Sequence, residues 1–286
     1  MRVHLIDGTY ELFRHYYGAK DALESRTAAT RGVLGTVVAM LGDGATHIGV
    51  ATDHVIESFR NDLWPGYKSS AGMPEPLLAQ FPLLEEALDA LGIFVWPMIE
   101  LEADDALASA AVVAADHPDV EQVAIWTPDK DLGQCVRDNR VVQVDRRNKK
   151  VIDAAAVEAK FGVGPTSVPD WLALVGDSAD GYPGIPGFGA KTAAAVLQRY
   201  GHVADIPDDG WDVPVRGAAT LAATLREQRA LATLFVELAT LRVDRQLLDS
   251  VEQLRWRGPT DGFDAMCQHL NATGIRDRAL ALLPRQ

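Results

Sequence analysis

Nine carboxylates occur in five short segments of this 286-residue sequence. If the folded chain brings them together, they repel one another and their pKa values rise. Divalent cations relieve such repulsion, and a ligand set without histidine or cysteine favours Mg²⁺ or Mn²⁺ over Zn²⁺. Two such ions support an in-line displacement at a phosphate group. The candidate metal ligands are Asp7, Asp53, Glu102, Asp104, Asp105, Asp129, Asp131, Asp177 and Asp180.

Local spacing favours this grouping in two of the segments. In "ELEADDALASAA", Glu102 and Asp105 are three residues apart and would share a helix face, with Asp104 at the adjacent edge. Acids in a first helical turn are also common without a metal, because they interact well with the helix dipole. In "TPDKDLGQC", Asp129 and Asp131 would point the same way if the chain were extended.

A glycine-rich stretch stands shortly after the last two acids, which belong to "GDSAD". The stretch "GIPGFGAKTA" looks like the hairpin of a helix-hairpin-helix, in which backbone amides and a helix N-terminus contact phosphates. A purely structural turn explains the glycines alone equally well. The nearby acids favour the phosphate interpretation. The candidate DNA-binding residues here are Gly184, Gly187, Gly189, Lys191 and Thr192.

The segment "FRNDLWPGYKSS" adds two cations and an aromatic ring beyond Asp53. If it lies over the metal ions, Lys68 and Arg60 would steady the scissile phosphate as catalytic residues, and Tyr67 would stack on a base. The alternative is that both cations are solvated surface charges, as most lysines and arginines are.

Composition constrains the class of protein. The net charge of -13 argues against a nucleic-acid partner at first sight, because phosphate contacts usually need a surplus of lysine and arginine. If the nine acids bind metal, however, only 31 acids remain against 27 basic residues. The two cysteines lie far apart and outside any metal-binding spacing, which favours a reducing compartment. We expect a cytoplasmic protein without a signal peptide or a membrane partner.

Apolar runs and helical periodicity alternate in the first half of the chain. The runs "VHLID", "HIGVATD" and "VAIWTPD" predict buried strands that end at Asp7, Asp53 and Asp129. The stretches "GVLGTVVAML", "PLLAQFPLLEEALDALG" and "DDALASAAVVAA" between them predict helices. This alternation indicates an α/β fold with a parallel sheet, whose functional crevice lies at the carboxyl ends of the strands. Any one of these aspartates alone could simply end a strand or cap a helix.

The second half of the chain is mainly helical. "VQVDRRNKKVIDAAAVEAKFG" predicts a short hairpin with a basic turn and then a helix, and further helices are predicted over "VPDWLALVG", "AKTAAAVLQRYG" and "AATLREQRALATLFVELATL". We therefore expect an α/β core over residues 1–153, with an arch segment near 60–80, and a helical DNA-binding subdomain over 154–286.

Taken in order, five pieces of the sequence resemble the 5′-nuclease family, which includes flap endonucleases and the N-terminal nuclease domain of bacterial DNA polymerase I. The pieces are "LIDGTYELFR", "FRNDLWPGYK", "LEADDALA", "PDKDLGQ" and "VGDSADGYPGIPGFGAKTA". The resemblance implies a PIN-like, mostly parallel sheet flanked by helices, followed by a helical subdomain with a helix-hairpin-helix. It also implies K⁺ bound by backbone carbonyls around Gly184 to Gly189.

The resemblance further divides the nine acids between two metal ions. Asp7, Asp53, Glu102 and Asp104 would surround the first ion, with Asp105 beside it. The second ion would be surrounded by Asp129, Asp131, Asp177 and Asp180. The sequence departs from the family where Ala71 replaces a frequent arginine, Gly181 a frequent asparagine and Pro128 a frequent glycine.

These features predict a metal-dependent 5′-nuclease that hydrolyses DNA at 5′ flaps, nicks or free 5′ ends and leaves a 5′-phosphate and a 3′-hydroxyl. We expect a stand-alone monomeric enzyme that works with partners in replication and repair. Two alternatives remain open at this point. One is a structure-specific DNA-binding protein that has lost catalysis, and the other is a ribonuclease of the PIN fold.

Overall fold

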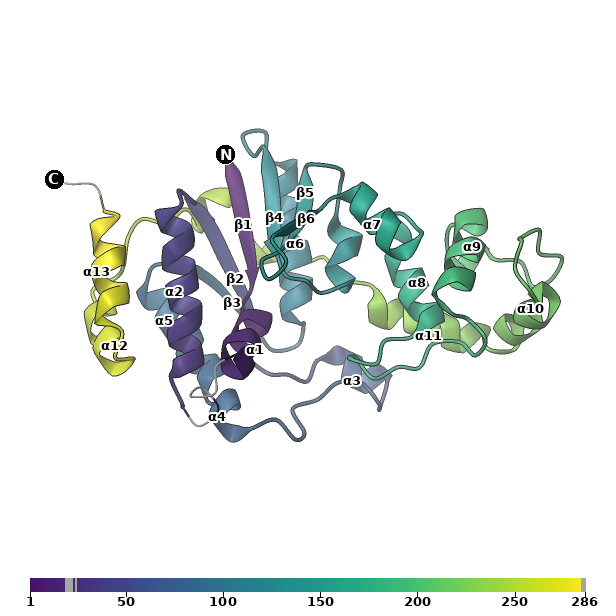
Figure 1. Cartoon of the computed structure of the whole chain (residues 1–286), viewed down its shortest axis with the longest axis horizontal. Coiled ribbons are helices and arrows are strands. Elements are labelled where there is room, and N and C mark those ends of the chain that lie inside the picture. The colour runs from purple at the N-terminus through teal and green to yellow at the C-terminus, as the bar shows by residue number, and fades with distance from the viewer. Residues whose placement is uncertain (19–22, 24, 284–286) are drawn as a thin grey trace. The chain divides into compact units, whose positions relative to one another are not determined.

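The computed structural model describes residues 1–18, 23 and 25–283 of the chain (Figure 1). The chain forms two compact units, each assembled from segments that are separated in the sequence. Unit 1 comprises Met1–Ile56, Ser70–Thr127 and Val243–Gln286, and unit 2 comprises Glu57–Ser69 and Pro128–Arg242. Among the described residues, no helix is both long enough and apolar enough to span a membrane.

The strands of unit 1 are β1 (Arg2–Asp7), β2 (His47–Asp53), β3 (Phe94–Met98) and β4 (Gln122–Trp126). They pair in parallel in the order β3-β2-β1-β4. Every residue of β2 is buried, as is typical of an inner strand in a sheet covered on both faces. Because β1 and β2 run in parallel and end at Asp7 and Asp53, both carboxylates lie at the same edge of the sheet.

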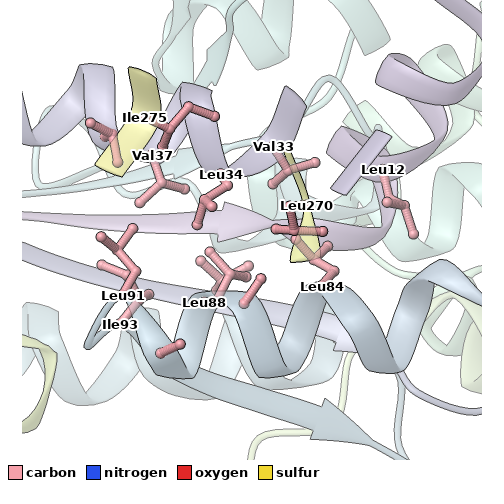
Figure 2. Close-up of a cluster of buried hydrophobic side chains, with 14 of the residues drawn as sticks. Leu12, Val33, Leu34, Val37, Leu84, Leu88, Leu91, Ile93, Leu270 and Ile275 are labelled. Atoms are coloured by element: carbon pink, nitrogen blue, oxygen red, sulfur yellow. The ribbon is translucent and has the colours of Figure 1, made fainter. Parts of the chain in front are cut away.

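The helices of unit 1 are α1 (Gly8–Gly18), α2 (Ala28–Gly42), α4 (Glu75–Leu78), α5 (Gln80–Ala90), α6 (Ala103–Asp116), α12 (Phe263–His269) and α13 (Thr273–Ala281). Helix α6 packs against all four parallel strands. Helices α1, α2 and α5 build the main apolar core with β1 and β2. In Figure 2, Val33, Leu34 and Val37 of α2 face Leu84 and Leu88 of α5, at the three- and four-residue spacing of an amphipathic helix.

Residues after Val243 complete the same core. Helix α12 packs on α5 and α13 packs on α2, which Figure 1 shows as yellow ribbons beside these helices. The side chains of Leu270 and Ile275 are buried in the apolar core at this contact. The short 3-10 helices η5 (Arg245–Leu247) and η6 (Val251–Leu254) precede α12 in this part of unit 1.

Unit 2 has a separate apolar core. Its largest contact joins α8 (Val168–Val175) to α11 (Arg229–Ala239), where Leu172 and Phe235 are fully buried. Gly162 ends α7 (Ala154–Phe161) in the left-handed conformation that favours glycine, with φ of 75°. The other elements are α3 (Phe59–Leu63), η2 (Asp131–Cys135), β5 (Val141–Asp145), β6 (Lys150–Ile152), α7 (Ala154–Phe161), η3 (Pro165–Ser167), α9 (Ala190–Tyr200), η4 (Val203–Asp205) and α10 (Ala218–Glu227).

The predicted fold class is confirmed: a mostly parallel sheet is flanked by helices, and a helical part follows. The predicted strand ends at Asp7 and Asp53 are also confirmed. Strand β4 instead ends at Trp126, so Asp129 lies beyond it in the segment that leads to η2. Strand β3 was missed, because its short run "FVWPM" contains a proline and lacks the clear apolar pattern of the others.

The boundary expected between residues 153 and 154 does not coincide with the boundary of the compact units. Residues 57–69 and 128–153 belong to the helical unit 2, whereas residues 243–286 belong to unit 1. The reason is long-range packing, since the Arg60 guanidinium donates to Leu238 O in unit 2 and α12 and α13 pack on unit 1. The helical stretch expected near residue 228 is divided there into α10 and α11.

Candidate functional site

Three carboxylates of unit 2 converge. Each of Asp131, Asp177 and Asp180 offers one oxygen that lies within 4.8 Å of the oxygens of the other two. Among the described residues, this is the group of acidic, histidine or cysteine side chains whose geometry fits a metal ion. We call it the carboxylate trio. Asp131 opens η2, and the other two acids lie in the loop after α8.

The electrostatics of the trio favour a bound cation. Asp131 is buried, and its Oδ1 has no hydrogen-bond partner. Burial raises the pKa of Asp131 well above its ordinary value, and the charges of Asp129, Asp180 and Asp177 raise it further. A buried carboxylate oxygen without a donor, in an all-oxygen group, is a suitable ligand for a hard divalent ion. These residues therefore fit the divalent metal expected from the sequence.

Two lysines flank the trio. The Lys68 ammonium lies 3.5 Å from Asp180 Oδ1, and the Lys68 backbone N–H donates to Asp180 O at 3.0 Å. The Lys130 ammonium lies 2.7 Å from Asp177 Oδ2. Burial lowers the pKa of Lys130, but pairing with Asp177 and the charges of Asp131 and Asp129 together outweigh burial, and the pKa is raised. Lys68 was predicted beside the metal site, whereas Lys130 was missed although acids flank it on both sides in the sequence.

Two glycines lie close together at the base of the loop that carries Asp177 and Asp180. Gly176 and Gly184 both have positive φ, and a Cβ added to Gly184 would lie 2.4 Å from the Gly176 nitrogen. Between them, Asp177 and Tyr182 exchange two backbone hydrogen bonds of 2.9 and 3.0 Å. The separation of the two ligands is thus set by backbone geometry that glycine alone permits.

The predicted helix-hairpin-helix is present as α8, the glycine-rich loop and α9. Gly184 and Gly187 adopt φ of 72° and 88°, and Gly189 is the N-cap of α9 without a side chain to cap it. Lys191 is exposed and Thr192 half-buried in the first turn, where backbone N–H groups lack partners within the helix. The arrangement is suited to an anion at this N-terminus.

The candidate ligands of unit 1 are held differently. Asp7 Oδ1 accepts from the Tyr10 N–H at 2.8 Å, and Asp7 Oδ2 accepts from the Thr127 hydroxyl at 2.9 Å. Asp53 Oδ1 accepts from the Ala103 N–H at 2.7 Å, at the start of α6. These carboxylates cap the segments that follow the strands, so they have structural roles in addition to any role in metal binding.

The three acids at the start of α6 also differ in burial and in hydrogen bonding. Glu102 is the N-cap residue, and its N–H donates to Asp105 Oδ2 at 2.9 Å. Asp105 is fully buried, whereas Asp104 is half-buried in the first turn. Asp129, in unit 2, accepts from the Asp131 N–H through Oδ1 at 3.1 Å. The chain between Asp129 and Asp131 is not extended, because it turns here into η2, so the condition under which the two side chains would point the same way is not met.

Two residues of the segment after Asp53 lie in the interior of unit 2. Arg60 is 1% exposed, and its guanidinium donates to Leu238 O at 2.8 Å and to Thr240 O at 3.2 Å. Tyr67 is 5% exposed and packs in the unit 2 core. These positions give both residues structural roles in place of the phosphate contact and base stacking expected from the sequence. The reason is that α3 packs its buried face on α11.

Comparison with known proteins assigns the chain to a family. Residues 2–162 match the family model of the 5′-3′ exonuclease N-terminal resolvase-like domain, and residues 163–262 match that of the 5′-3′ exonuclease C-terminal SAM fold. A 5′-3′ exonuclease from Buchnera aphidicola subsp. Schizaphis graminum is 30% identical over 84% of this chain and 86% of the relative.

One further relative and one solved structure extend the comparison. DNA polymerase I from Pseudomonas aeruginosa is 34% identical over 87% of this chain, but the match spans 28% of the polymerase. The solved flap endonuclease of bacteriophage T5, in a complex with DNA and metal ions, shares the fold with a TM-score of 0.64 at 19% identity, covering 98% of this chain and 100% of that one. With its two domains matched in order and a relative covered over most of its length, the chain belongs to the 5′-3′ exonuclease family.

Proposed function

We propose that this member of the 5′-3′ exonuclease family hydrolyses DNA phosphodiester bonds at 5′ flaps, nicks and free 5′ ends, and that it selects them by branch structure. The observation that carries the proposal is the carboxylate trio, in which the buried Asp131 Oδ1 lacks a donor and the other two acids lie in the loop between α8 and α9 of the helix-hairpin-helix. Related proteins support it, since the T5 flap endonuclease was solved with DNA and metal ions.

The ions we propose are Mg²⁺ or Mn²⁺, because every candidate ligand is an oxygen. In this proposal Asp131, Asp177 and Asp180 hold one ion, with Asp129 beside them. Bound divalent ions supply Lewis-acid stabilisation of the charge that develops on phosphate oxygens. The residues proposed for a further ion are the acids of unit 1, Asp7, Asp53, Glu102, Asp104 and Asp105.

Lys68 is proposed to stabilise the developing phosphate charge. Its ammonium lies beside Asp180, is partly exposed, and is held by a backbone hydrogen bond to the same residue. A positive charge fixed next to the reacting phosphate stabilises the transition state more than the ground state. We assign this role to Lys68 alone, because Arg60 is buried in unit 2.

The hairpin is proposed to hold the DNA backbone. Its glycines permit close approach of a phosphate, and the free N–H groups of the first turn of α9, with Lys191 and Thr192, offer donors. Such contacts carry no base information, so affinity should depend on branch structure and salt and not on sequence. We also propose K⁺ at the carbonyls around Gly184 to Gly189, and a monomer that works with replication or repair partners.

The test uses the purified chain with a labelled 5′-flap duplex, a nicked duplex and a single-stranded RNA, each with Mg²⁺, Mn²⁺ or EDTA. We expect cleavage of the two DNAs with either metal and none in EDTA. Undiminished cleavage by metal-stripped protein would overturn the metal mechanism. Preferred cleavage of the RNA would favour a PIN-fold ribonuclease, and tight flap binding without cleavage in any metal would favour a binding protein.

A further inference from the structure

Lys130 stands between two candidate metal ligands, and none of the roles proposed above uses it. Its ammonium lies 2.7 Å from Asp177 Oδ2 and is one-third exposed, whereas the Asp177 side chain is 2% exposed. The other oxygen of Asp177, Oδ1, accepts from the Ala179 N–H at 2.9 Å. Both oxygens of Asp177 therefore have a donor in this structure.

The trio also contains a buried carboxylate oxygen without a donor. Asp131 Oδ1 has no hydrogen-bond partner, and the Lys68 ammonium is 3.5 Å from Asp180 Oδ1, which is longer than the Lys130 contact. A divalent ion that takes Asp177 as a ligand through Oδ2 competes with the ammonium of Lys130 for that oxygen. Even where the ligand is Oδ1, a fixed positive charge so close to the site opposes the entry of a second cation.

We propose that Lys130 is a resident cation of the carboxylate trio, which neutralises Asp177 in the metal-free protein and competes with the divalent ion for that carboxylate. The competition makes metal binding weaker than the ligand set alone would allow. It also keeps three neighbouring acids together in the folded metal-free chain. This inference rests on the proposed function, because it takes the trio to be a metal site.

The test measures Mn²⁺ binding to the DNA-free protein by isothermal titration calorimetry. The binding phase of the trio is the one that Asp131→Asn removes. For Lys130→Met we expect this phase to tighten by about 3- to 10-fold, because a partly exposed ion pair that competes with the metal is lost. Unchanged or weaker binding in Lys130→Met would overturn the proposal.

Two control variants sharpen this result. Lys130→Arg keeps the positive charge and should bind Mn²⁺ as the wild type does, whereas tightening in this variant would show that charge is not the cause. Lys150→Met removes an exposed lysine of β6 and should leave Mn²⁺ binding unchanged. If Lys130→Met fails to fold, Lys130→Gln repeats the measurement with a polar side chain of similar length.

A second readout follows the metal-free state. In EDTA, the melting temperature of Lys130→Met should be lower than that of the wild type, and saturating Mn²⁺ should abolish the difference. In an Asp177→Asn background, Lys130→Met should have a smaller effect in EDTA, because its nearest partner charge is gone and only the charges of Asp131 and Asp129 remain. An equal destabilisation in both backgrounds would contradict the pairing. No readout depends on cleavage, so a chain that shows this competition but cuts no DNA would refute only the proposed function.

Discussion

The acids of unit 1 and the carboxylate trio of unit 2 come from similar sequence patterns, but the fold uses them in opposite ways. Asp7 and Asp53 accept hydrogen bonds from backbone N–H groups, and Asp7 also accepts from a hydroxyl. In the trio, Asp131 is buried with an oxygen that lacks a donor, and lysines provide the nearest compensation. Asp7 and Asp53 therefore have neutral donors within the fold, whereas Asp131 retains an oxygen that a bound cation would satisfy.

The largest expected effect is on cleavage. Asp177→Asn removes a charge from the trio while nearly preserving shape, so flap cleavage should fall by at least about 100-fold, the usual cost of losing one preorganised group. Flap affinity in Ca²⁺ should be retained, because the hairpin is intact. A Mg²⁺ titration of cleavage and a binding assay check this. Near-normal cleavage with lost affinity would make Asp177 a turn residue and remove the distinction between the two groups.

The next effect concerns the cations near the trio. Lys68→Ala should lower the single-turnover cleavage rate by more than about 10-fold with little change in DNA affinity, because its charge acts on the transition state. Arg60→Met is the matched comparison, since its buried guanidinium donates to backbone carbonyls. It should lower the melting temperature and leave the rate of the folded protein unchanged. A normal rate for Lys68→Ala would make Lys68 a surface charge.

The sharpest contrast in stability is between Asp7 and Asp131. In EDTA, Asp7→Ala should lower the free energy of unfolding by about 2 kcal/mol or more, because it leaves two donors unpaired. Asp131→Asn should raise it, because it removes a buried charge beside other acids. Urea unfolding of both variants checks the signs. If Asp131→Asn instead destabilises the metal-free protein, the charge of Asp131 is compensated in the folded state, as the charge of Asp7 is.

The pH dependence follows from the same carboxylate. Because the pKa of Asp131 is raised in the folded state, the metal-free protein binds this proton more tightly when folded than when unfolded. The contribution of Asp131 to stability is therefore fully present at low pH and decreases as pH rises from the unfolded pKa of about 4 through the raised folded pKa. Melting temperatures in EDTA at several pH values should show this decrease in the wild type and less of it in Asp131→Asn. An equal slope in both proteins would assign the effect to other groups.

The smallest effect compares two buried tyrosines. The Tyr182 hydroxyl has no hydrogen-bond partner, and burial together with the trio raises its pKa. The Tyr16 hydroxyl in unit 1 donates to Leu23 O at 2.8 Å. Tyr16→Phe should cost about 1 kcal/mol in unfolding free energy, and Tyr182→Phe should be neutral or slightly stabilising. A cost of similar size at Tyr182 would indicate a partner for its hydroxyl that remains in the metal-free protein.

Local patterns predicted much of this molecule. Apolar runs located the strand ends at Asp7 and Asp53, and the spacing of Asp177 and Asp180 before the glycines located the loop of the trio. These features depend on residues close together in sequence, and glycines with positive φ mark the turns that need them. Such features can be predicted without knowledge of tertiary contacts.

Long-range packing was not predictable in the same way. The burial of Arg60 and Tyr67 depends on contacts with α11 and its neighbours, more than a hundred residues away. The charge of Arg60 favours a surface position by its type, and the carbonyls of Leu238 and Thr240 help to explain why it is buried. The pairing of Lys130 with Asp177 likewise joins two motifs whose distance in space is not encoded in their spacing.

The packing of α12 and α13 onto α2 and α5 has a consequence for synthesis on the ribosome. Unit 1 needs strands from the first residues of the chain and helices from beyond Val243, whereas all segments of unit 2 precede residue 243. Domains fold as their residues emerge, so we expect unit 2 to reach its native core while unit 1 is still incomplete. Until α12 and α13 emerge, the parts of α2 and α5 that these two helices cover stay exposed. Unit 1, which contains the first residues of the chain, is thus the unit that is completed last.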